Sequence, residues 1–533
     1  MPDSKLQRHY YLFAALAGTL ALLSIDLLFP LNWDNEIFQS MAMDLIRFGR
    51  LPYLGSWAHD FPGTVYMQWL SIMLFGNSDF GFRSFDMTLH LGMAWMFYSL
   101  LCHWLSPRTA CLAVLLYMLH YISDAFIMAS QRDEFATAFL LIGTILLFAA
   151  AKFQKSCIPK YLAAIGAGVA LTTMLTFRAT YGTFALVGIV FFLLQSEDRI
   201  YLVVSYMIGV TCLLSALLIP YAIHHGGIEQ AYLIIVRYNL EIYGEIREPF
   251  KIVVIQIMKR KLFFLPAFAG ILLAFRSSLR RTFNINRLWR SVTLPKSSER
   301  WLFVGYCVCG LISLLVMGKF LPYHFEPIML VVLPFAALGI ESLIAAIPGR
   351  PWRITAISAL CLYAFLRVYP LFLVRPFANA IMTGEPIEIA KNNMTSAEAG
   401  FRRNVDVAAA SYIDETAPSG NCVACATLTA GVRLRTTRLC VSRFTTFYPL
   451  SMSAPDGSHP DFQQAWRIEF IDSLLIERPY YIVLGNGPAE VVDWVHKPPS
   501  QCIHEIEGFD SLIMPHYKID TNIGGYSILR RSD

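Results

Sequence analysis

Long apolar segments alternate with short polar segments over roughly the first 375 residues of the chain. Most of the apolar segments have about 18 residues or more, which is the length that a helix needs to cross the hydrocarbon core of a membrane. The pattern therefore predicts a polytopic α-helical membrane protein with about eleven spans. We expect them near residues 10–30, 83–105, 109–130, 134–153, 160–177, 180–195, 200–223, 260–276, 301–318, 324–347 and 352–374.

Two further regions depart from this pattern. The apolar run "TVYMQWLSIMLFG" (64–76) is short for a span and suits a helix lying in the membrane interface. After residue 375 the chain becomes more polar, and strand-like segments such as "NCVACATL", "LCVSRF" and "RPYYIVLGNG" alternate with helix-like segments. We expect a transmembrane domain over 1–375, with an external loop and juxtamembrane helices at 31–82, and a soluble α/β domain over 376–533.

Composition agrees with this organisation. The 533 residues are 56% hydrophobic and 15% charged, with a mean hydropathy of +0.50, whereas soluble domains are usually about a quarter charged. The net charge of +5 is too small and scattered to indicate nucleic-acid binding. Four of the eleven cysteines lie in the polar C-terminal part: Cys422, Cys425, Cys440 and Cys502. A disulfide can form between them if this part faces an oxidising compartment, and the sequence leaves the pairing open.

Basic residues in the short loops predict the orientation. They are more frequent on the side that includes the N-terminus, which places the N-terminus in the cytoplasm and the C-terminal domain outside. Several cations remain on the outer side, and an anionic lipid ligand would explain them.

Two acidic clusters reach that same outer face. Asp34 and Glu36 follow the first span, and Arg132-Asp133-Glu134 follow the third. Each cluster could simply begin a helix, with Asp34 as an N-cap of a helix that stops at Gly49. Unpaired charge is costly at the hydrocarbon boundary, so finding acids there twice on one face favours a functional role.

A membrane-surface carboxylate can act as a general base on an acceptor hydroxyl, and nearby cations can stabilise a departing phosphate. A sugar carried on a lipid phosphate combines both requirements. Alternatively, the acids could hold a divalent cation such as Mg, Mn or Ca, and the candidate ligands are then Asp34, Asp133 and Glu134.

The segment "WDNEIFQSMAMDLIRFGRLPYLGSWAHDFPGTVYMQWLSIMLFGNSDFGFRSFD" resembles the first external loop of the GT-C glycosyltransferases. The likeness is to bacterial enzymes that depend on polyprenyl-phosphate sugars and are related to protein O-mannosyltransferases and the lipid A aminoarabinose transferase. It covers residues 10–155 and, less fully, 315–375. The matching features are the acids at 34 and 36, the turn at 49–53, "HDFPG" at 59–63, "LFG" at 74–76, Arg83, and "RDE" at 132–134.

One departure from the family pattern concerns the first acids. The family often has adjacent acids, whereas here Asn35 separates Asp34 from Glu36. Residues i and i+2 of a helix project about 200° apart, so the two carboxylates would not point the same way. The resemblance therefore implies Asp34 as the base, with Glu36 as a second catalytic candidate.

The resemblance implies an inverting glycosyltransferase that moves a sugar from a polyprenyl-phosphate carrier to an envelope lipid, polysaccharide or protein hydroxyl in the bacterial periplasm. It also implies that residues 34 and 133 converge on one pocket. Candidates for binding the donor phosphate are Arg132, Asp133, Glu134, Arg178, Lys319, Tyr323 and His324, and those for the acceptor entrance are His59 and Asp60. The alternatives are a transporter or flippase of polyprenyl-linked substrates and a non-catalytic protein of envelope assembly.

Overall fold

The computed structural model describes residues 5–123, 130–152, 157–194, 198–245, 247–279, 297–368, 371–386, 389–390, 403–486 and 497–532. The chain forms two compact units. Unit 1 comprises Met1–Phe29, Ser78–Leu217 and Arg247–Leu371. Unit 2 comprises Pro30–Asn77, Leu218–Ile246 and Phe372–Asp533. The first loop therefore groups with the C-terminal part, while the predicted domain limits at 375 and 376 stay a prediction.

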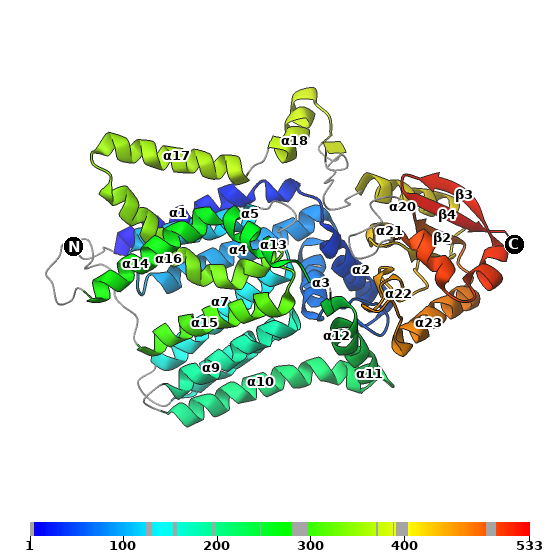
Figure 1. The fold of residues 1–533 in the computed structure, drawn as a ribbon, viewed down its shortest axis with the longest axis horizontal. Coiled ribbons are helices and arrows are strands. Elements are labelled where there is room, and N and C mark those ends of the chain that lie inside the picture. Colours follow the sequence, from blue (N-terminus) through cyan, green and yellow to red (C-terminus); the bar gives the residue numbers. More distant parts are fainter. Residues whose placement is uncertain are drawn as a thin grey trace. The chain divides into compact units, whose positions relative to one another are not determined.

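Unit 1 is built almost entirely from helices (Figure 1). A helix overlaps each of the predicted spans, which confirms the helical membrane fold. The long helices are α1 (Lys5–Leu23), α4 (Asp79–Leu101), α5 (Pro107–Ile122), α7 (Arg132–Lys152), α8 (Ile158–Thr173), α9 (Thr183–Leu193), α10 (Arg199–Ala222), α13 (Phe250–Lys259), α14 (Lys261–Leu279), α15 (Ser297–Met317), α16 (Glu326–Ala346) and α17 (Arg350–Val368).

Within the described part of the chain, five helical segments are long and apolar enough to cross a membrane by length and composition. They are Lys5–Leu28, Arg132–Lys152, Ile158–Thr176, Arg199–Ala222 and Pro322–Ala346. Shorter apolar helices lie at Pro107–Ile122, Ala179–Leu193, Phe263–Leu272 and Trp301–Met317. The chain is thus a multi-pass membrane protein.

Unit 2 begins with helices α2 (Trp33–Phe48) and α3 (Gly63–Phe75). Asn32 caps α2, because its side chain accepts a hydrogen bond from the Asn35 backbone N–H at 2.9 Å. The alternative that Asp34 is the N-cap is therefore wrong, and Asp34 lies in the first turn instead. The helix ends at Gly49 as predicted, where φ is +65°. Helix α3 covers all but the last residue of the short apolar run at 64–76, as predicted. Its position in the membrane interface stays a prediction.

The C-terminal domain contains a four-stranded sheet (Figure 1). Its order is β1 (Val423–Ala426), β2 (Tyr481–Gly485), β4 (Tyr526–Arg531) and β3 (Tyr517–Ile523). β1 and β2 are parallel, and the other pairs are antiparallel. The further helices of this unit are α11 (Gly227–Tyr232), α12 (Asn239–Glu241), α18 (Leu371–Thr383), α20 (Arg403–Thr416), α21 (Gly431–Arg435), α22 (Tyr448–Ser451), α23 (Asp461–Glu477) and α24 (Pro499–Cys502).

Successive side chains of a strand point to opposite sides, and in β1 and β2 the side chains on both sides are buried. One face carries Ala424 and Ile482 and shares its core with Trp57 of the first loop. The Trp57 ring packs edge-on against Trp466 of α23 with centroids 5.7 Å apart. The predicted α/β domain is thus confirmed, but "LCVSRF" forms only isolated bridges there rather than a strand of the sheet.

Candidate functional site

The turn before α7 places the predicted cluster Arg132-Asp133-Glu134 at the start of that helix. Ser130 adopts a left-handed conformation, with φ of +63°, which is uncommon for a residue with a side chain. Its backbone N–H donates to the Tyr121 hydroxyl at 2.8 Å, and its hydroxyl accepts from Arg83 at 2.9 Å. These contacts with α4 and α5 hold the turn in a strained conformation and so fix where α7 begins.

Asp133 is fully buried and paired through both carboxylate oxygens. Arg178 donates to them from Nε at 2.9 Å and from Nη2 at 3.2 Å, and the Tyr181 hydroxyl donates a short hydrogen bond. Arg178 lies just before the short helix η3 (Ala179–Gly182). Two parallel bonds of this kind fix the orientation of a guanidinium as well as its position.

The other predicted donor-binding residues lie around this pair. Arg178, Arg132 and Lys319 all interact electrostatically with the imidazole of His324. The guanidinium of Arg178 lies 5.8 Å from the centroid of the Tyr323 ring. The structure therefore brings the predicted cations into one group inside unit 1.

The segment that carries Lys319 and His324 is also strained. Phe320 has a φ of +47°, and the short helix η8 (Pro322–Phe325) follows and leads into α16. Lys319 is 8% exposed and His324 is 2% exposed. Among the described residues, neither ring nitrogen of His324 has a hydrogen-bond partner. Buried polar groups are usually satisfied, which favours a ligand contact for this side chain.

Glu134 lies next to this group but has different neighbours. It is fully buried and interacts electrostatically with Glu326 and Asp133. A carboxylate oxygen of Glu326 lies 3.1 Å from Nε2 of His120. Neither His120 nor Glu326 was among the predicted site residues, although Glu326 stands directly before a long apolar segment, which is a recognisable feature.

A second polar group lies along α4, and Arg83 is the one member of it that was noted in the sequence. Arg83, Asp86 and His90 fall at spacings that place them on one face of the helix. His90 lies 3.4 Å from Asp86, and Arg83 lies 3.7 Å from Asp26. These charges compensate one another inside unit 1, and Arg83 links them to the Ser130 turn.

In unit 2 the first acids occupy different faces of α2. Asp34 is partly buried, whereas Glu36 is 2% exposed and pairs with Arg435 of α21 at 2.5 Å. Both lie in regular helix, so their side chains project about 200° apart, as predicted. A second buried pair links Asp44 of α2 to Arg433 of α21, also at 2.5 Å.

The predicted acceptor-entrance residues follow the turn at 49–53. His59 Nε2 lies 3.7 Å from a carboxylate oxygen of Asp60, and the His59 ring packs on Tyr243 with centroids 3.9 Å apart. The buried Tyr53 has a φ of +70°, and its hydroxyl donates to the Asp60 backbone carbonyl at 2.7 Å. The turn therefore has a defined and strained conformation next to these two side chains.

The predicted metal ligands do not form a ligand set in the described residues. No group of three or more His, Cys, Asp or Glu side chains there is arranged to hold a metal ion. Both oxygens of Asp133 already accept hydrogen bonds from Arg178 and Tyr181, which makes that carboxylate a poor cation ligand. The contacts of Asp133 fit better with a role in which its carboxylate positions Arg178.

A family model matches part of the sequence. Residues 59–224 match the family described as dolichyl-phosphate-mannose-protein mannosyltransferase. The match includes the 132–134 cluster and Arg178 and ends before Lys319. A search among proteins of curated function gives no significant match.

Solved structures share the fold over nearly the whole chain. ArnT from Cupriavidus metallidurans in the apo state is 11% identical with a TM-score of 0.57, over 98% of this chain and 97% of that one. ArnT bound to undecaprenyl phosphate is 11% identical with a TM-score of 0.56, over 99% and 98%. The Archaeoglobus fulgidus oligosaccharyltransferase in the apo form is 11% identical with a TM-score of 0.52, over 90% and 70%. The family match and the shared fold confirm the predicted resemblance to the GT-C glycosyltransferases.

Proposed function

We propose that this chain is an inverting glycosyltransferase that uses a polyprenyl-phosphate sugar on the periplasmic face of the bacterial inner membrane. The N-terminus would be cytoplasmic and the C-terminal domain periplasmic. The observation that carries the proposal is the group formed by Arg132, Arg178, Lys319 and His324 around the Asp133–Arg178 pair. The ArnT structure with the same fold is bound to undecaprenyl phosphate, which is a ligand of this class.

The cationic group would bind the donor phosphate. A phosphate released from a sugar gains charge as the bond to the anomeric carbon breaks, and preorganised cations stabilise that charge. Asp133, which also accepts a hydrogen bond from Tyr181, holds Arg178 in one orientation, so little reorganisation is needed when the phosphate leaves. Arg132 and Lys319 would neutralise the rest of the negative charge on the phosphate. Tyr323 and His324 lie next to Arg178 and would contact the same phosphate.

Asp34 would act on the acceptor. Its carboxylate accepts the proton of the acceptor hydroxyl while the oxygen attacks the anomeric carbon from the side opposite the phosphate. The new bond to oxygen forms as the bond to the phosphate oxygen breaks, which inverts the anomeric centre. The placing of His59 and Asp60 at the acceptor entrance is also part of this proposal.

In this scheme we assign Glu36 the role of positioning α2, through its pair with Arg435 of α21. Its carboxylate is buried and paired with Arg435, so a proton from the acceptor would have to displace an ion pair. Asp34 lies on another side of α2 and is partly buried. Of the two candidates, Asp34 is therefore the better base.

The test begins with lipid and glycan mass spectrometry of a deletion strain, which identifies the sugar that disappears and its acceptor. The purified full-length protein is then given the matching polyprenyl-phosphate sugar and acceptor. We expect a transferred sugar of inverted configuration, detected by mass spectrometry and NMR. Movement of the intact lipid-linked sugar across a vesicle membrane without transfer would instead indicate the transporter alternative.

A further inference from the structure

Helix α21 and the residues that follow it connect α2 to the C-terminal sheet within unit 2. Arg435 pairs with Glu36, and Arg433 pairs with Asp44, so both arginines bind the same helix. Arg433 also donates to the backbone carbonyls of Ser442 and Phe444 at 2.8 and 3.1 Å. We call residues 425–440 the clamp segment, because two of its three arginines, Arg433 and Arg435, hold α2.

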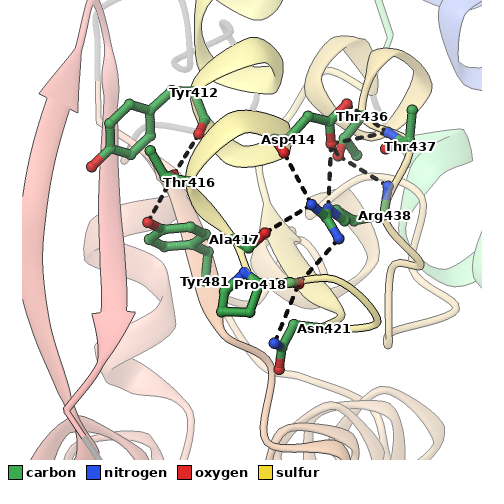
Figure 2. A network of polar contacts seen from close by, with 10 residues as sticks. All are labelled: Tyr412, Asp414, Thr416, Ala417, Pro418, Asn421, Thr436, Thr437, Arg438 and Tyr481. Carbon is green, nitrogen blue, oxygen red and sulfur yellow. Dashed lines mark hydrogen bonds and ion pairs between the residues drawn. The ribbon is translucent and has the colours of Figure 1, made fainter.

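The C-terminal end of the clamp segment is tied to helix α20 (Figure 2). Asp414 accepts hydrogen bonds from the Thr436 hydroxyl at 2.6 Å and from the Thr437 backbone N–H at 3.0 and 3.1 Å. Arg438 donates to the backbone carbonyls of Asp414 at 2.9 Å and of Ala417 at 2.8 Å. These bonds satisfy carbonyls at the end of α20 and orient the chain as it returns to the sheet.

The two ends of the clamp segment meet beside β1. Cys440 is bridged to Val423, whose backbone N–H donates to the Leu439 carbonyl at 2.9 Å and whose carbonyl accepts from the Val441 N–H at 2.9 Å. Cys425 is two residues from Val423 and therefore points to the same face of β1. Its Sγ lies 3.7 Å from the Sγ of Cys440, and both side chains are buried.

We propose that Cys425 and Cys440 form a disulfide that closes the clamp segment and so fixes the arginines that hold α2. The proposal rests on the proposed periplasmic location of the C-terminal domain, because disulfides persist in oxidising compartments. The other cysteines of this domain are not placed for this bond: Cys422 and Cys502 donate to the backbone carbonyls of Glu477 and Lys497.

The reaction needs an external disulfide as oxidant. The Cys440 thiolate attacks a sulfur of that disulfide, which releases one thiolate of the oxidant and leaves a mixed disulfide on Cys440. The Cys425 thiolate then attacks Cys440 and releases the second thiolate, so the two cysteines lose two electrons and two protons while the oxidant becomes a dithiol. The hydrogen bond from Cys425, together with Arg433, lowers the pKa of Cys440, which favours it as the attacking group. Both sulfurs are buried in the folded unit, so the bond forms as the domain folds.

A peptide map of the full-length protein tests the bond directly. Cells are lysed without reductant while free thiols are alkylated, and the purified protein is digested with trypsin before any reduction. Trypsin cuts after Arg433, Arg435 and Arg438, so the bond would join peptide 404–433 to peptide 439–443. Peptide 404–433 also contains Cys422, and Cys422→Ser is therefore the matched control.

We expect the linked pair in the unmodified protein and in Cys422→Ser, its loss in Cys425→Ser, and its return when reduced protein is refolded with oxidised glutathione. Finding Cys440 alkylated, or joined to Cys422 or Cys502, would overturn the proposal. The map of the unmodified chain decides the matter even if a serine variant fails to fold.

A second measurement asks whether the bond supports α2. Closing a loop of this length restricts the unfolded chain, so the reduced protein or Cys425→Ser should lose transferase activity on heating about tenfold faster than Cys422→Ser. Equal rates would refute the positioning effect. A linked pair in a protein without transferase activity would count against the proposed function and leave the disulfide standing. Full transferase activity in a protein without the linked pair would overturn the disulfide and leave the proposed function standing.

Discussion

Asp133 in unit 1 and Glu36 in unit 2 are both buried carboxylates paired with an arginine, yet their surroundings differ. The partners of Asp133 lie 45 and 48 residues away in the sequence, whereas Arg435 lies 399 residues from Glu36. Around Asp133 two further cations, Arg132 and Lys319, gather near His324. Glu36 and Asp44 each pair with one arginine, and within each pair the two charges neutralise one another. An ion pair at a predicted site is thus a stronger clue to function when further cations gather around it.

The largest expected effect tests whether unit 2 contributes chemistry as well as support. Asp34→Asn removes the proposed base and should reduce turnover by about 10²–10⁴-fold, because the acceptor hydroxyl loses its proton acceptor. Turnover with the lipid-linked sugar measures it, and thermal unfolding checks the fold. The matched control is Asp472→Asn on an exposed position of α23, which should leave turnover unchanged. Normal turnover of Asp34→Asn would remove the base assignment.

The next effect concerns the cationic group of unit 1. Arg178→Ala should lower kcat by about 10²–10³-fold, because a preorganised donor to the leaving phosphate is lost. Arg178→Lys should recover only part of this, since an ammonium cannot reproduce the two parallel bonds to Asp133. Arg108→Ala, whose side chain is 59% exposed, serves as the control. If Arg178→Ala changes stability but not kcat, then the pair in unit 1 is structural, like that in unit 2.

A stability measurement tests the other half of the comparison, the Glu36–Arg435 pair in unit 2. Arg435→Ala should destabilise unit 2 by roughly 3–5 kcal/mol, because it leaves the buried carboxylate of Glu36 without its partner. Adding Glu36→Gln should restore part of that loss, and a double-mutant cycle measured by denaturant unfolding gives the coupling. Lys497→Ala breaks an exposed pair with Glu505 and should change stability little. Additive effects at positions 36 and 435 would contradict the clamp.

The smallest effect is expected at Tyr181. Tyr181→Phe removes one hydrogen bond to Asp133 while both bonds from Arg178 remain. A hydrogen bond of this kind contributes about 1–1.5 kcal/mol, which corresponds to roughly a tenfold change in turnover or less. Steady-state kinetics should show the change in kcat rather than in the KM for the acceptor. A loss as large as that of Arg178→Ala would mean that Tyr181 contacts the substrate itself.

Much of the helical part could be read from the sequence. The predicted spans agree with helices because their apolar length leaves a membrane segment few alternatives. The turn at Gly49 was predictable because glycine readily adopts a positive φ. The cap at Asn32 was not, because Asn32 and Asp34 are both good capping residues and only the entry path of the chain decides between them.

The sequence by itself determined the membrane class, the position of the acids at the ends of helices and the opposite directions of Asp34 and Glu36, since these follow from hydropathy and from helix geometry. Only the tertiary structure decided that Glu36 pairs with Arg435 and that Asp44 pairs with Arg433. Arg435 reaches Glu36 because α21 packs against α2, and Cys440 reaches Cys425 because the chain after α21 returns beside β1. Contacts of this kind depend on three-dimensional packing between distant segments, and no local pattern of residues encodes them.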